Sequence, residues 1–455
     1  MAVILPKPNV PFLLERPDLV TPQWYEKLKQ IADGAGGGGG SSLTGASEAE
    51  AIAGTDDTKY STPLRVADAI KGYQFATQSS GVARTIIDRS RDWAVANDFS
   101  DGTGTPSNDI AALNAAVTAA GPSKGLLLTR PFSIPSTWTI NKAGVKVQSG
   151  GEGVQITPTA SMTSIVDVTA NFVSLEGLKF IGNGVATNAV SVSKGHTNQP
   201  TKIRDCQFWN IPRGILVNYG SDAVWIDSNL FFTISGQGIR MNGANYESRI
   251  FGNWMIDIGT GMEFLISGGS LQAEGLKISH NTVLLYTTGI YLNGSYAFTI
   301  ENNVIGNCLS GGVGINLNGS NQNNAHNIVN NFIGGDGYGN FGIAMTGTAV
   351  ANIVMNNEIS QWLQAPIACV GTTNDGTTIQ NNRLRFNGGT PAQAGLVMNT
   401  CTRFLAMNNH FPQVGGTSIF AVGTCTDSWV VFNVTYGASM NTGGATGVNI
   451  GVNNR

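Results

Sequence analysis

The stretch Ile226-Asp227-Ser228-Asn229-Leu230-Phe231 carries the phrase that decides the fold: an apolar residue, two variable residues, asparagine, any residue and a second apolar residue. The phrase recurs along the chain, centred on Asn253, Asn281, Asn303, Asn331, Asn357, Asn382, Asn409 and Asn433. Upstream, Cys206 and Leu178 stand where the asparagine would be. Neighbouring asparagines lie 22–28 residues apart, and a period of this length indicates a protein of stacked repeats.

A second phrase, glycine followed by alternating apolar residues, lies between successive asparagines, as in Gly238-Ile239-Arg240-Met241 and Gly289-Ile290-Tyr291-Leu292. Each repeat therefore holds at least two short strands with tight turns. Such a repeat is too short for a propeller blade and lacks the helix content of leucine-rich repeats. Because progression in a parallel array is right-handed, we expect a mainly β protein, a right-handed parallel β-helix of about 10–11 coils over residues 140–455.

The recurring asparagine has a physical explanation in such a solenoid. Stacked coils lie about 4.8 Å apart, so equivalent side chains on neighbouring coils come within hydrogen-bonding distance. Asparagine also adopts a left-handed backbone conformation at low cost. We therefore expect the asparagines to occupy left-handed corners, with each buried amide bonded to the next one.

Composition limits the possible classes of function. Charged residues make up 12% of the chain and the formal net charge is -3, which predicts no steering toward nucleic acid or an anionic membrane. No apolar run approaches the roughly 20 residues of a membrane span, and the chain begins without the apolar stretch of a secretory signal. The five cysteines form no Cys-x-x-Cys pair, so we expect buried free thiols, synthesis in a cytoplasm, no metal centre and no cofactor.

The start of the chain differs in texture from the repeats. Residues 1–33 combine several prolines with a short helix predicted to begin at Thr21, and they are too few to bury a core of their own. This segment should therefore dock on another surface. Residues 34–42 are almost entirely glycine and serine and are expected to form a flexible linker.

Two further segments precede the β-helix. Residues 43–83 are rich in charged and small residues and contain a second short helix predicted to begin at Thr62. Residues 84–139 lead into the solenoid. Their amphipathic helix over 110–120, with Ser107-Asn108-Asp109 as its cap, is expected to cover the open end of the first coil.

Two phrases in these segments resemble bacteriophage tail fibres and tailspikes. Val82–Trp93, Asp98–Gly102 and the alanine-rich helix that follows Asn108-Asp109 are similar to the segment with which phage β-helix tailspikes begin their solenoid. Glu48–Ile70, with Gly54-Thr55-Asp56 and Thr62-Pro63, is similar to a small neck module of phage tail fibres. The β-helix itself resembles that of pectate lyases, at the level of the fold.

The resemblance implies a role and an assembly. A member of that family would be a homotrimer and a virion component, hung from phage tail proteins through residues 1–33 and adsorbing to host surface polysaccharide or lipopolysaccharide. The glycine-rich linker over 34–42 fits such a fibre, because it lets the solenoid swing about its docking site. The resemblance implies neither membrane insertion nor nucleic-acid binding.

Counting back from the asparagines identifies a candidate acidic column. Asp222, Glu247 and Glu274 lie seven, six and seven residues before the asparagines of three successive coils. Glycoside hydrolases hold two carboxylates about 5 Å or about 6.5–9.5 Å apart, which one or two coil steps supply. These three acids are therefore the candidate catalytic residues, although solvated turn residues would give the same pattern.

Aromatic residues accompany the acids. Trp225 and Tyr246 are the candidate glycan-binding residues, because aromatic rings contact the faces of sugar rings. The acidic column could also bind a cation, but no arginine or lysine is evident opposite it, as lyase chemistry would require. His280 and His326 are expected on the surface.

These observations leave two classes of function open. The first is a non-catalytic tail fibre that binds host glycan. The alternative is a polysaccharide depolymerase, a glycoside hydrolase or a lyase, on the same scaffold. We favour the first, because no long insertion builds a deep groove. A secreted cellular lyase is a third reading, and the N-terminal phrases argue against it.

Overall fold

The computed structural model describes the chain from residue 93 to residue 451, together with two short strands upstream. The two strands, β1 (Gln74–Phe75) and β2 (Arg84–Thr85), pair antiparallel. Within 93–451 the description omits residues 101–102, 123, 152, 195–199, 244, 266–272, 319–322, 371–372, 387–393, 413–416, 437–438 and 442–444.

The chain divides into two compact units, Met1–Asp92 and Trp93–Arg455. The predicted anchor (1–33), linker (34–42) and neck module (43–83) fall outside the described residues, apart from β1 in the neck module.

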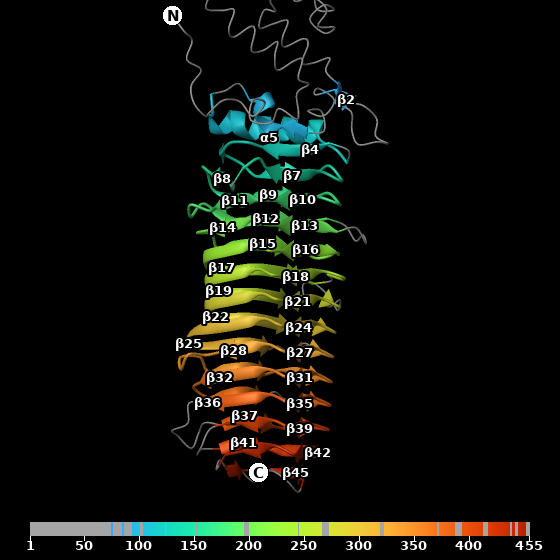
Figure 1. Ribbon diagram of the computed structural model, residues 1–455, viewed down its shortest axis with the longest axis vertical. Helices are drawn as coiled ribbons and strands as arrows, with labels where there is room; N and C mark the ends of the chain where they lie inside the picture. The colour runs from blue at the N-terminus through green and yellow to red at the C-terminus, as the bar shows by residue number, and fades with distance from the viewer. Residues whose placement is uncertain are drawn as a thin grey trace, which may run out of the picture. The chain divides into compact units, whose positions relative to one another are not determined.

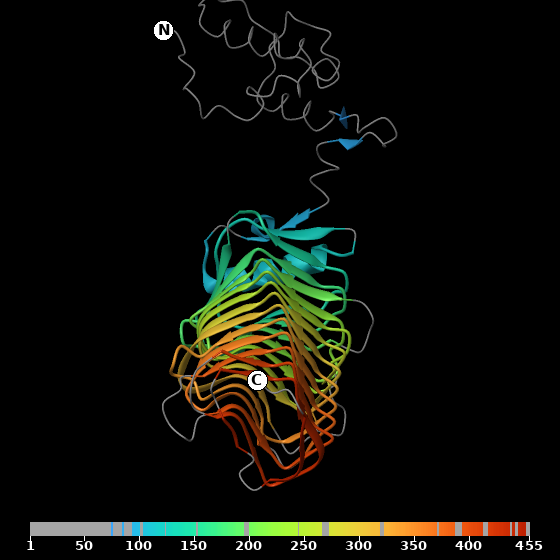
Figure 2. The same ribbon diagram turned by 60° about the horizontal axis from the view of Figure 1, so that its bottom comes forward.

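The second unit is a parallel right-handed β-solenoid of about 11 turns, as the asparagine repeat predicts. Figure 1 shows its strands stacked one above another from β4 to β45, and Figure 2 shows the coils from nearer their axis. Each coil contributes to two long stacks of parallel strands, here called sheet 1 and sheet 2, and the middle coils add a third stack of very short strands, sheet 3.

The bounds of the strands follow the repeat. Sheet 1 contains β3 (Trp93–Val95), β4 (Gly125–Leu128), β7 (Lys146–Ser149), β10 (Ser174–Glu176), β13 (Thr201–Arg204), β16 (Val224–Asp227), β18 (Arg249–Phe251), β21 (Lys277–Ser279), β24 (Thr299–Glu301), β27 (Asn327–Val329), β31 (Ile353–Met355), β35 (Thr378–Gln380), β39 (Leu405–Met407), β42 (Thr424–Val431) and β45 (Thr446–Ile450). Sheet 3 contains β20 (Ala273–Glu274), β23 (Ser295–Tyr296), β26 (Asn323–Asn324), β30 (Thr348–Val350), β34 (Thr373–Asp375) and β38 (Cys401–Thr402).

Sheet 2 bends at a corner, so most coils contribute two strands to it. The first leg contains β5 (Phe132–Ile134), β8 (Val154–Pro158), β11 (Leu178–Ile181), β14 (Gln207–Trp209), β28 (Phe332–Gly334), β32 (Glu358–Trp362), β36 (Arg383–Phe386), β40 (His410–Phe411) and β43 (Val434–Thr435). The second leg contains β6 (Trp138–Ile140), β9 (Met162–Val168), β12 (Ala186–Val192), β15 (Arg213–Val217), β29 (Phe341–Met345), β33 (Ala365–Cys369), β37 (Ala394–Asn399), β41 (Thr417–Val422) and β44 (Ser439–Asn441). In four middle coils one long strand runs through the corner: β17 (Leu230–Asn242), β19 (Trp254–Leu265), β22 (Thr282–Asn293) and β25 (Val304–Leu317).

The solenoid begins earlier than the predicted boundary at residue 140. Strand β3 already pairs in parallel with β4, and β4 pairs with β7. Strands β5 and β6 pair in the same way with β8 and β9. Residues assigned from the sequence to the lead-in segment therefore form the first coil, whose strands lack the asparagine that marks the later ones.

The asparagines form the expected ladder inside the solenoid. From Asn229 to Asn409, each side-chain amide nitrogen donates to the amide oxygen of the asparagine one coil further on, at 2.9–3.1 Å. Cys206 heads the ladder, because its backbone N–H donates to Asn229 Oδ1 at 3.0 Å. The ladder satisfies amides that are at most 2% exposed, which removes the cost of burying them unpaired.

The left-handed corner lies one residue earlier than predicted. Ser228, Gly252 and His280 have φ values of 56°, 65° and 58°, and each precedes a ladder asparagine. In later coils the left-handed residue is often a second asparagine, as at Asn302 and Asn330. The ladder asparagine is therefore needed for its buried amide. The residue before it is needed for the left-handed backbone conformation of the turn.

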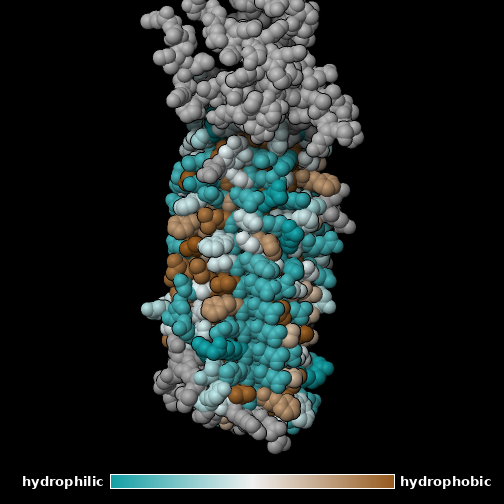
Figure 3. Space-filling model, in the orientation of Figure 1, coloured by the Kyte–Doolittle hydropathy of each residue, from teal (hydrophilic) through white to brown (hydrophobic). Residues whose placement is uncertain are grey.

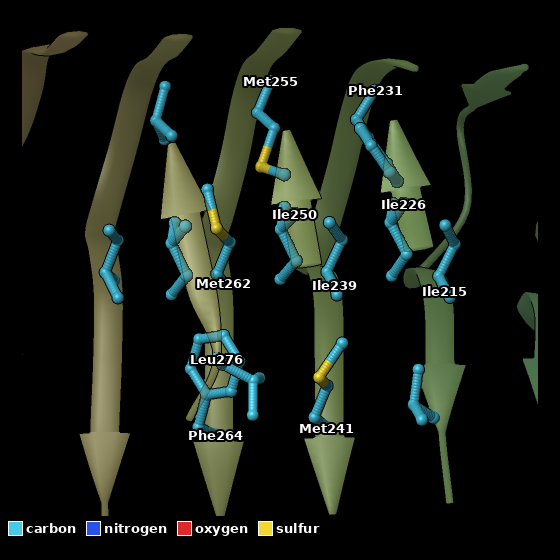
Figure 4. Packing of buried hydrophobic residues seen from close by; sticks show 14 of the residues in the cluster. Ile215, Ile226, Phe231, Ile239, Met241, Ile250, Met255, Met262, Phe264 and Leu276 are labelled. Atoms are coloured by element: carbon cyan, nitrogen blue, oxygen red, sulfur yellow. The ribbon is translucent and has the colours of Figure 1, made fainter. Parts of the chain in front are cut away.

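Columns of identical or similar apolar residues fill the interior. Figure 4 shows Ile215, Ile239 and Met262 stacked on one leg of sheet 2, opposite Ile226 and Ile250 of sheet 1. These side chains are fully buried, and each contributes roughly 1.5–3 kcal/mol through removal from water. The core is therefore a set of axial columns that run along the whole solenoid.

The glycine of the second phrase is explained by close packing between coils. A Cβ on Gly238 would lie 2.7 Å from the carbonyl oxygen of Gly261, and a Cβ on Gly261 would lie 2.5 Å from that of Gly289. Because real Cβ atoms do not approach a backbone oxygen so closely, only glycine fits this column.

The helix that covers the first coil is α5 (Pro106–Ala119), next to the 3₁₀ helix η2 (Ala96–Phe99). It begins earlier than predicted: Thr105 is the N-cap, and the predicted cap Ser107-Asn108-Asp109 lies inside the first turn. Its buried side chains face η2 and strands β3, β5 and β6. In the described part of the chain, no helix is long and apolar enough to cross a membrane.

Asp109 fastens this helix to the first coil. Its carboxylate is 2% exposed and accepts hydrogen bonds from Arg130 Nη2 at 2.6 Å and from the backbone N–H of Ser133 at 2.8 Å. The acid predicted as a helix cap is thus a buried partner of the solenoid.

Candidate functional site

The predicted acidic column contains Asp222 and Glu274, but Tyr246 stands where Glu247 was expected. The backbone N–H of Tyr246 donates to Asp222 Oδ1 at 3.0 Å, and Tyr246 pairs in register with Glu274. Glu247 is the next residue, in a left-handed corner with φ of 51°. The structure therefore does not bring the three acids together, and an offset of six residues instead of seven is the reason.

The column continues beyond Glu274. Glu274 pairs with Tyr296 on the following coil, and the Tyr296 side chain is 41% exposed. Asp222, Tyr246, Glu274 and Tyr296 thus follow one another on four successive coils, and we call them the acidic–aromatic ridge. Tyr296 was missed, although it lies seven residues before Asn303, as Tyr246 does before Asn253.

A basic residue lies close to this ridge. Lys194 is 3% exposed; burial lowers the pKa of its ammonium group, and the nearby Asp222 carboxylate opposes that shift. Burial, together with the carboxylates of Asp222 and Glu274, raises the pKa of the Tyr246 phenol. The cation that the sequence did not reveal is therefore present, on the coil before Asp222, where the Ser221 hydroxyl donates to the backbone carbonyl oxygen of Lys194 at 3.1 Å.

Trp225 is held between two cations. Lys202 Nζ lies 4.9 Å from the centre of its ring, and Arg249 Cζ lies 4.4 Å from it. Lys202 and Arg249 belong to the coils before and after Trp225. Since both neighbouring coils place a cation against the ring, its edge is the part that a sugar could contact.

Two other acids on these coils, Asp227 and Glu263, belong to ion pairs across neighbouring strands. Asp227 Oδ2 lies 2.6 Å from Arg249 Nη2. Glu263 Oε2 lies 3.3 Å from Arg240 Nη1. Partly exposed pairs of this kind contribute little to stability, about 0–1 kcal/mol each, and hold the outer face of the sheets in register.

The two histidines differ from each other, and the expectation for His326 is wrong. His280 is exposed in a turn. His326 is fully buried: its Nδ1 accepts from the backbone N–H of Phe298 at 3.1 Å, and its Nε2 lies 3.1 Å from the Ser295 hydroxyl. Burial lowers the pKa of His326 to about 3, so the ring is a neutral core residue.

A groove of about 420 Å³ lies at the corner of sheet 2, on another face of the coils. Its polar lining comes from exposed residues at the corner, among them Thr233, Ser235 and Asp257, and its floor includes the buried Ile234 and Ile258. Sequence reasoning missed it, because a groove formed by short corners between protruding loops has no motif of its own.

The cysteines are free and buried, as predicted. Among the residues for which side chains are described, no group of three or more histidine, cysteine or acidic side chains is placed to hold a metal ion. The acidic–aromatic ridge has two carboxylates on alternate coils, which is a poor cage for a cation that takes 6–8 oxygen ligands.

Comparison with known proteins supports the fold. Residues 264–435 match the family model of a right-handed β-helix region. A comparison with curated protein sequences gives no significant match.

Solved structures show the same architecture at low sequence identity. The catalytic unit of a GH87 α-1,3-glucanase from Streptomyces thermodiastaticus is 14% identical, with a TM-score of 0.59 over 77% of this chain and 67% of that one. The DFA-IIIase of Arthrobacter chlorophenolicus is 11% identical, with a TM-score of 0.52 over 77% and 99%. A tailspike protein variant of the E. coli bacteriophage HK620, in complex with a pentasaccharide, is 12% identical, with a TM-score of 0.51 over 86% and 85%.

These likenesses concern the fold, since all three identities are far below the level at which chemistry carries over. Tailspikes and glycoside hydrolases are among the proteins that share it. By its matching region and its stacked parallel coils, the chain carries a right-handed β-helix of the kind found in phage tailspikes and glycan-cleaving enzymes.

Proposed function

We propose that this chain is a bacteriophage tail fibre or tailspike that adsorbs to host cell-surface glycan. The observation that carries the proposal is the acidic–aromatic ridge, where carboxylates and tyrosines alternate on four successive coils. Carboxylates accept hydrogen bonds from sugar hydroxyls, and aromatic rings cover the apolar faces of sugars. The tail-fibre phrases near residues 48–70 and 82–102 support the same reading.

Adsorption to the host tests the proposal. Purified protein should bind host cells, and purified capsule or lipopolysaccharide should compete with that binding. Replacing Tyr246 and Tyr296 by alanine should weaken adsorption about tenfold or more. Tyr338→Ala is the matched control, because this tyrosine is 62% exposed and lies outside the ridge. Unchanged adsorption of the double variant would remove the ridge from the proposal.

The fibre is proposed to be a homotrimer of side-by-side solenoids. Sheet 1 supports this, since its outer face changes from ion pairs in the early coils to apolar side chains in the last ones. Ile353 and Trp429 are 38% and 51% exposed, Met355, Leu405 and Met407 are half-buried, and the polar Thr378 and Gln380 of β35 lie between the two apolar groups. Exposed apolar side chains gathered on one face are typical of protein interfaces. A mass measurement that gives a monomer, or a Trp429→Lys variant that stays trimeric, would contradict this assembly.

Attachment to the tail is assigned to residues 1–33, with 34–42 as the linker. A chain that lacks residues 1–33 should keep its solenoid, because the described coils pair strand by strand with their neighbours, and should be missing from virions. Normal incorporation of the shortened chain would disprove the assignment.

A polysaccharide depolymerase is the second candidate, and one distance favours it. Asp222 and Glu274 are two coils apart, a backbone separation of about 9.6 Å, just above the 6.5–9.5 Å between the carboxyl groups of inverting glycosidases. New reducing ends from host polysaccharide, lost in Asp222→Asn and Glu274→Gln but retained in Glu247→Gln, would establish this activity. If no oligosaccharides are released, the non-catalytic, glycan-binding fibre remains as the proposed function.

A further inference from the structure

The five cysteines are unevenly spread along the solenoid, and all of them are buried. Cys206 and Cys308 stand alone in earlier coils. Cys369, Cys401 and Cys425 gather in the later coils, close enough for the charge of one thiol to shift the pKa of another. The later coils are therefore the place where sulfur chemistry between side chains has to be considered.

Cys401 and Cys425 occupy equivalent positions on neighbouring coils. Thr402 and Thr426 pair in parallel register, so the cysteines that precede them stand side by side. Neighbouring strands lie about 4.8 Å apart, within the range of about 4.4–6.8 Å that Cα atoms joined by a disulfide usually span. Both side chains are fully buried, and their thiols are hydrogen-bonded to each other.

This hydrogen bond makes the two sulfur atoms unequal. The Cys401 thiol donates to Cys425, which lowers the pKa of the Cys425 thiol although burial opposes the shift, and the backbone of Cys401 and Thr400 adds hydrogen bonds that favour the thiolate. The same contact between the thiols raises the pKa of Cys401. Because the thiolate is the reactive form of cysteine, Cys425 is the thiol that reacts first, and Cys401 lies ready to react with its product.

The position beside Cys425 on the following coil carries no side chain. Thr424 pairs with Thr446, which places Gly447 next to Cys425, and a Cβ on Gly447 would collide with the carbonyl group of Cys425. No side chain at that position covers the sulfur, and this favours a small oxidant. Because Cys425 is itself fully buried, a bulky oxidant has no access to it.

We propose that Cys401 and Cys425 are a peroxide-sensitive pair that joins the two coils by a disulfide bond. The Cys425 thiolate attacks one oxygen of hydrogen peroxide and becomes a sulfenic acid, while the O–O bond breaks and the second oxygen leaves as hydroxide, which takes up a proton to form water. Cys401 then loses its proton and attacks the Cys425 sulfur, which forms the S–S bond and displaces the hydroxyl group as a second water. Two thiols are oxidised to one disulfide, and one peroxide is reduced to two waters.

The cross-link fastens two coils that carry part of the apolar face of sheet 1. Leu405 and Met407 follow Cys401 in β39, and Trp429 follows Cys425 in β42. Figure 3 shows some apolar surface, in brown, near this lower end of the solenoid. A disulfide removes chain entropy from the opened state, so oxidation keeps these coils closed and their apolar side chains in place. The bond is expected once the protein leaves a reducing compartment.

The test treats the full chain, purified with reduced thiols, with hydrogen peroxide and then alkylates the remaining thiols in denaturant. Of the five thiols two should disappear, and mass mapping without reductant should find the peptides of Cys401 and Cys425 joined. Hydrogen exchange in β38 and β42 should slow at least about tenfold, and a reductant should reverse both effects. Five thiols that survive the treatment, a Cys425 sulfinic acid without a cross-link, or a bond between two chains would overturn the inference.

Serine variants assign the two roles. Cys401→Ser should leave the Cys425 sulfenic acid without a resolving thiol, so that a reagent specific for sulfenic acids labels it. Cys425→Ser should form neither the cross-link nor the labelled product. Cys369→Ser should keep the cross-link, since the Cys369 thiol lies against Met345, with 3.9 Å between the sulfur atoms. Loss of the bond in Cys369→Ser would contradict the assignment to this pair.

The solitary cysteines supply matched controls. Cys206 Sγ lies 3.6 Å from the carbonyl oxygen of Leu175, and the Cys308 thiol is hydrogen-bonded to the Tyr286 phenol. Since neither contacts a second thiol, Cys206→Ser and Cys308→Ser should form the cross-link as the parent does. The peptide map of the parent decides the question even where a variant folds poorly, because it requires no substitution.

Discussion

Two inner corners of the solenoid differ in the residues that fill their buried positions and in how the polar groups there are hydrogen-bonded. At one corner, every coil from Asn229 to Asn433 presents an asparagine, and each amide bonds to the next. At the other, the inward positions of successive coils hold a mixture of residues: Asn245, Ala273, Ser295, Asn323, Ala349, Asn374 and Cys401. There the Asn374 amide is fully buried and neither of its polar atoms has a hydrogen-bond partner.

The difference shows where the molecule is free to vary. At the asparagine corner the same residue recurs in every coil, so a change in one asparagine affects the asparagines of both neighbouring coils. At the other corner, here called the mixed corner, the inward residue differs from coil to coil. The outward residues that follow it form the acidic–aromatic ridge: Tyr246 after Asn245, Glu274 after Ala273, and Tyr296 after Ser295. The irregular corner is therefore the one that carries the proposed glycan contacts.

The largest loss of stability is expected from Asn303→Ala, at the asparagine corner. Its side chain donates to Ile278 O, Glu301 O and Asn331 Oδ1, and it accepts from the backbone and the side chain of Asn281. Because these bonds lie in the core and their partners would stay buried and unpaired, the variant should lose about 3 kcal/mol or more. Hydrogen exchange of the surrounding coils measures the loss.

Asn327→Ala is the control for that experiment, since Asn327 is exposed on sheet 1. It should cost less than about 0.5 kcal/mol. If both variants opened their coils equally, the ladder would not be the source of stability.

The mixed corner should respond to acid through His326. Its pKa is about 3 in the fold and about 6.5 in the unfolded chain. Only the unfolded chain takes up the proton between these values, so stability is complete above pH 6.5 and falls by up to about 1.4 kcal/mol per unit as the pH drops toward 3. Denaturation at several pH values should show a flatter profile for His326→Asn, the residue that the next coil has as Asn352. Identical profiles would contradict this assignment.

The smallest effect should come from Asn374→Ala, and its sign is opposite to that of the ladder variant. Both coils beside Asn374 carry small side chains at this position, Ala349 and Cys401. Removing a buried amide without partners should stabilise the protein by about 1 kcal/mol, less the cost of a small cavity. A denaturation midpoint that falls instead of rising would show that the amide has a partner in solution, such as a bound water.

The asparagine corner was predicted well from the sequence. A ladder asparagine needs the same neighbours in every coil, so it recurs at a readable spacing, and Cys206 at its head was recognised from the flanking pattern alone. The left-handed residue was placed one position late, because Ser228, Gly252 and His280 share a backbone angle but no side chain.

The candidate site was predicted less well. A count of seven residues back from each asparagine finds Asp222, Tyr246, Glu274 and Tyr296, whereas a search restricted to acids chose Glu247. Lys194 lies one coil before Asp222, and a count of seven residues back from Cys206 does not reach it. The groove depends on which loops protrude, and three extra residues in β25 leave no pattern in the sequence.

The ladder also has a consequence for how the chain can change in length. Each rung donates to one neighbour and accepts from the other, so a duplicated coil, such as residues 304–331, would find its donor and acceptor already in place. The duplication would lengthen the solenoid by about 4.8 Å without altering the helix at one end or the apolar face near the other. Gain and loss of whole coils is thus an evolutionary route by which such a protein can adjust its reach.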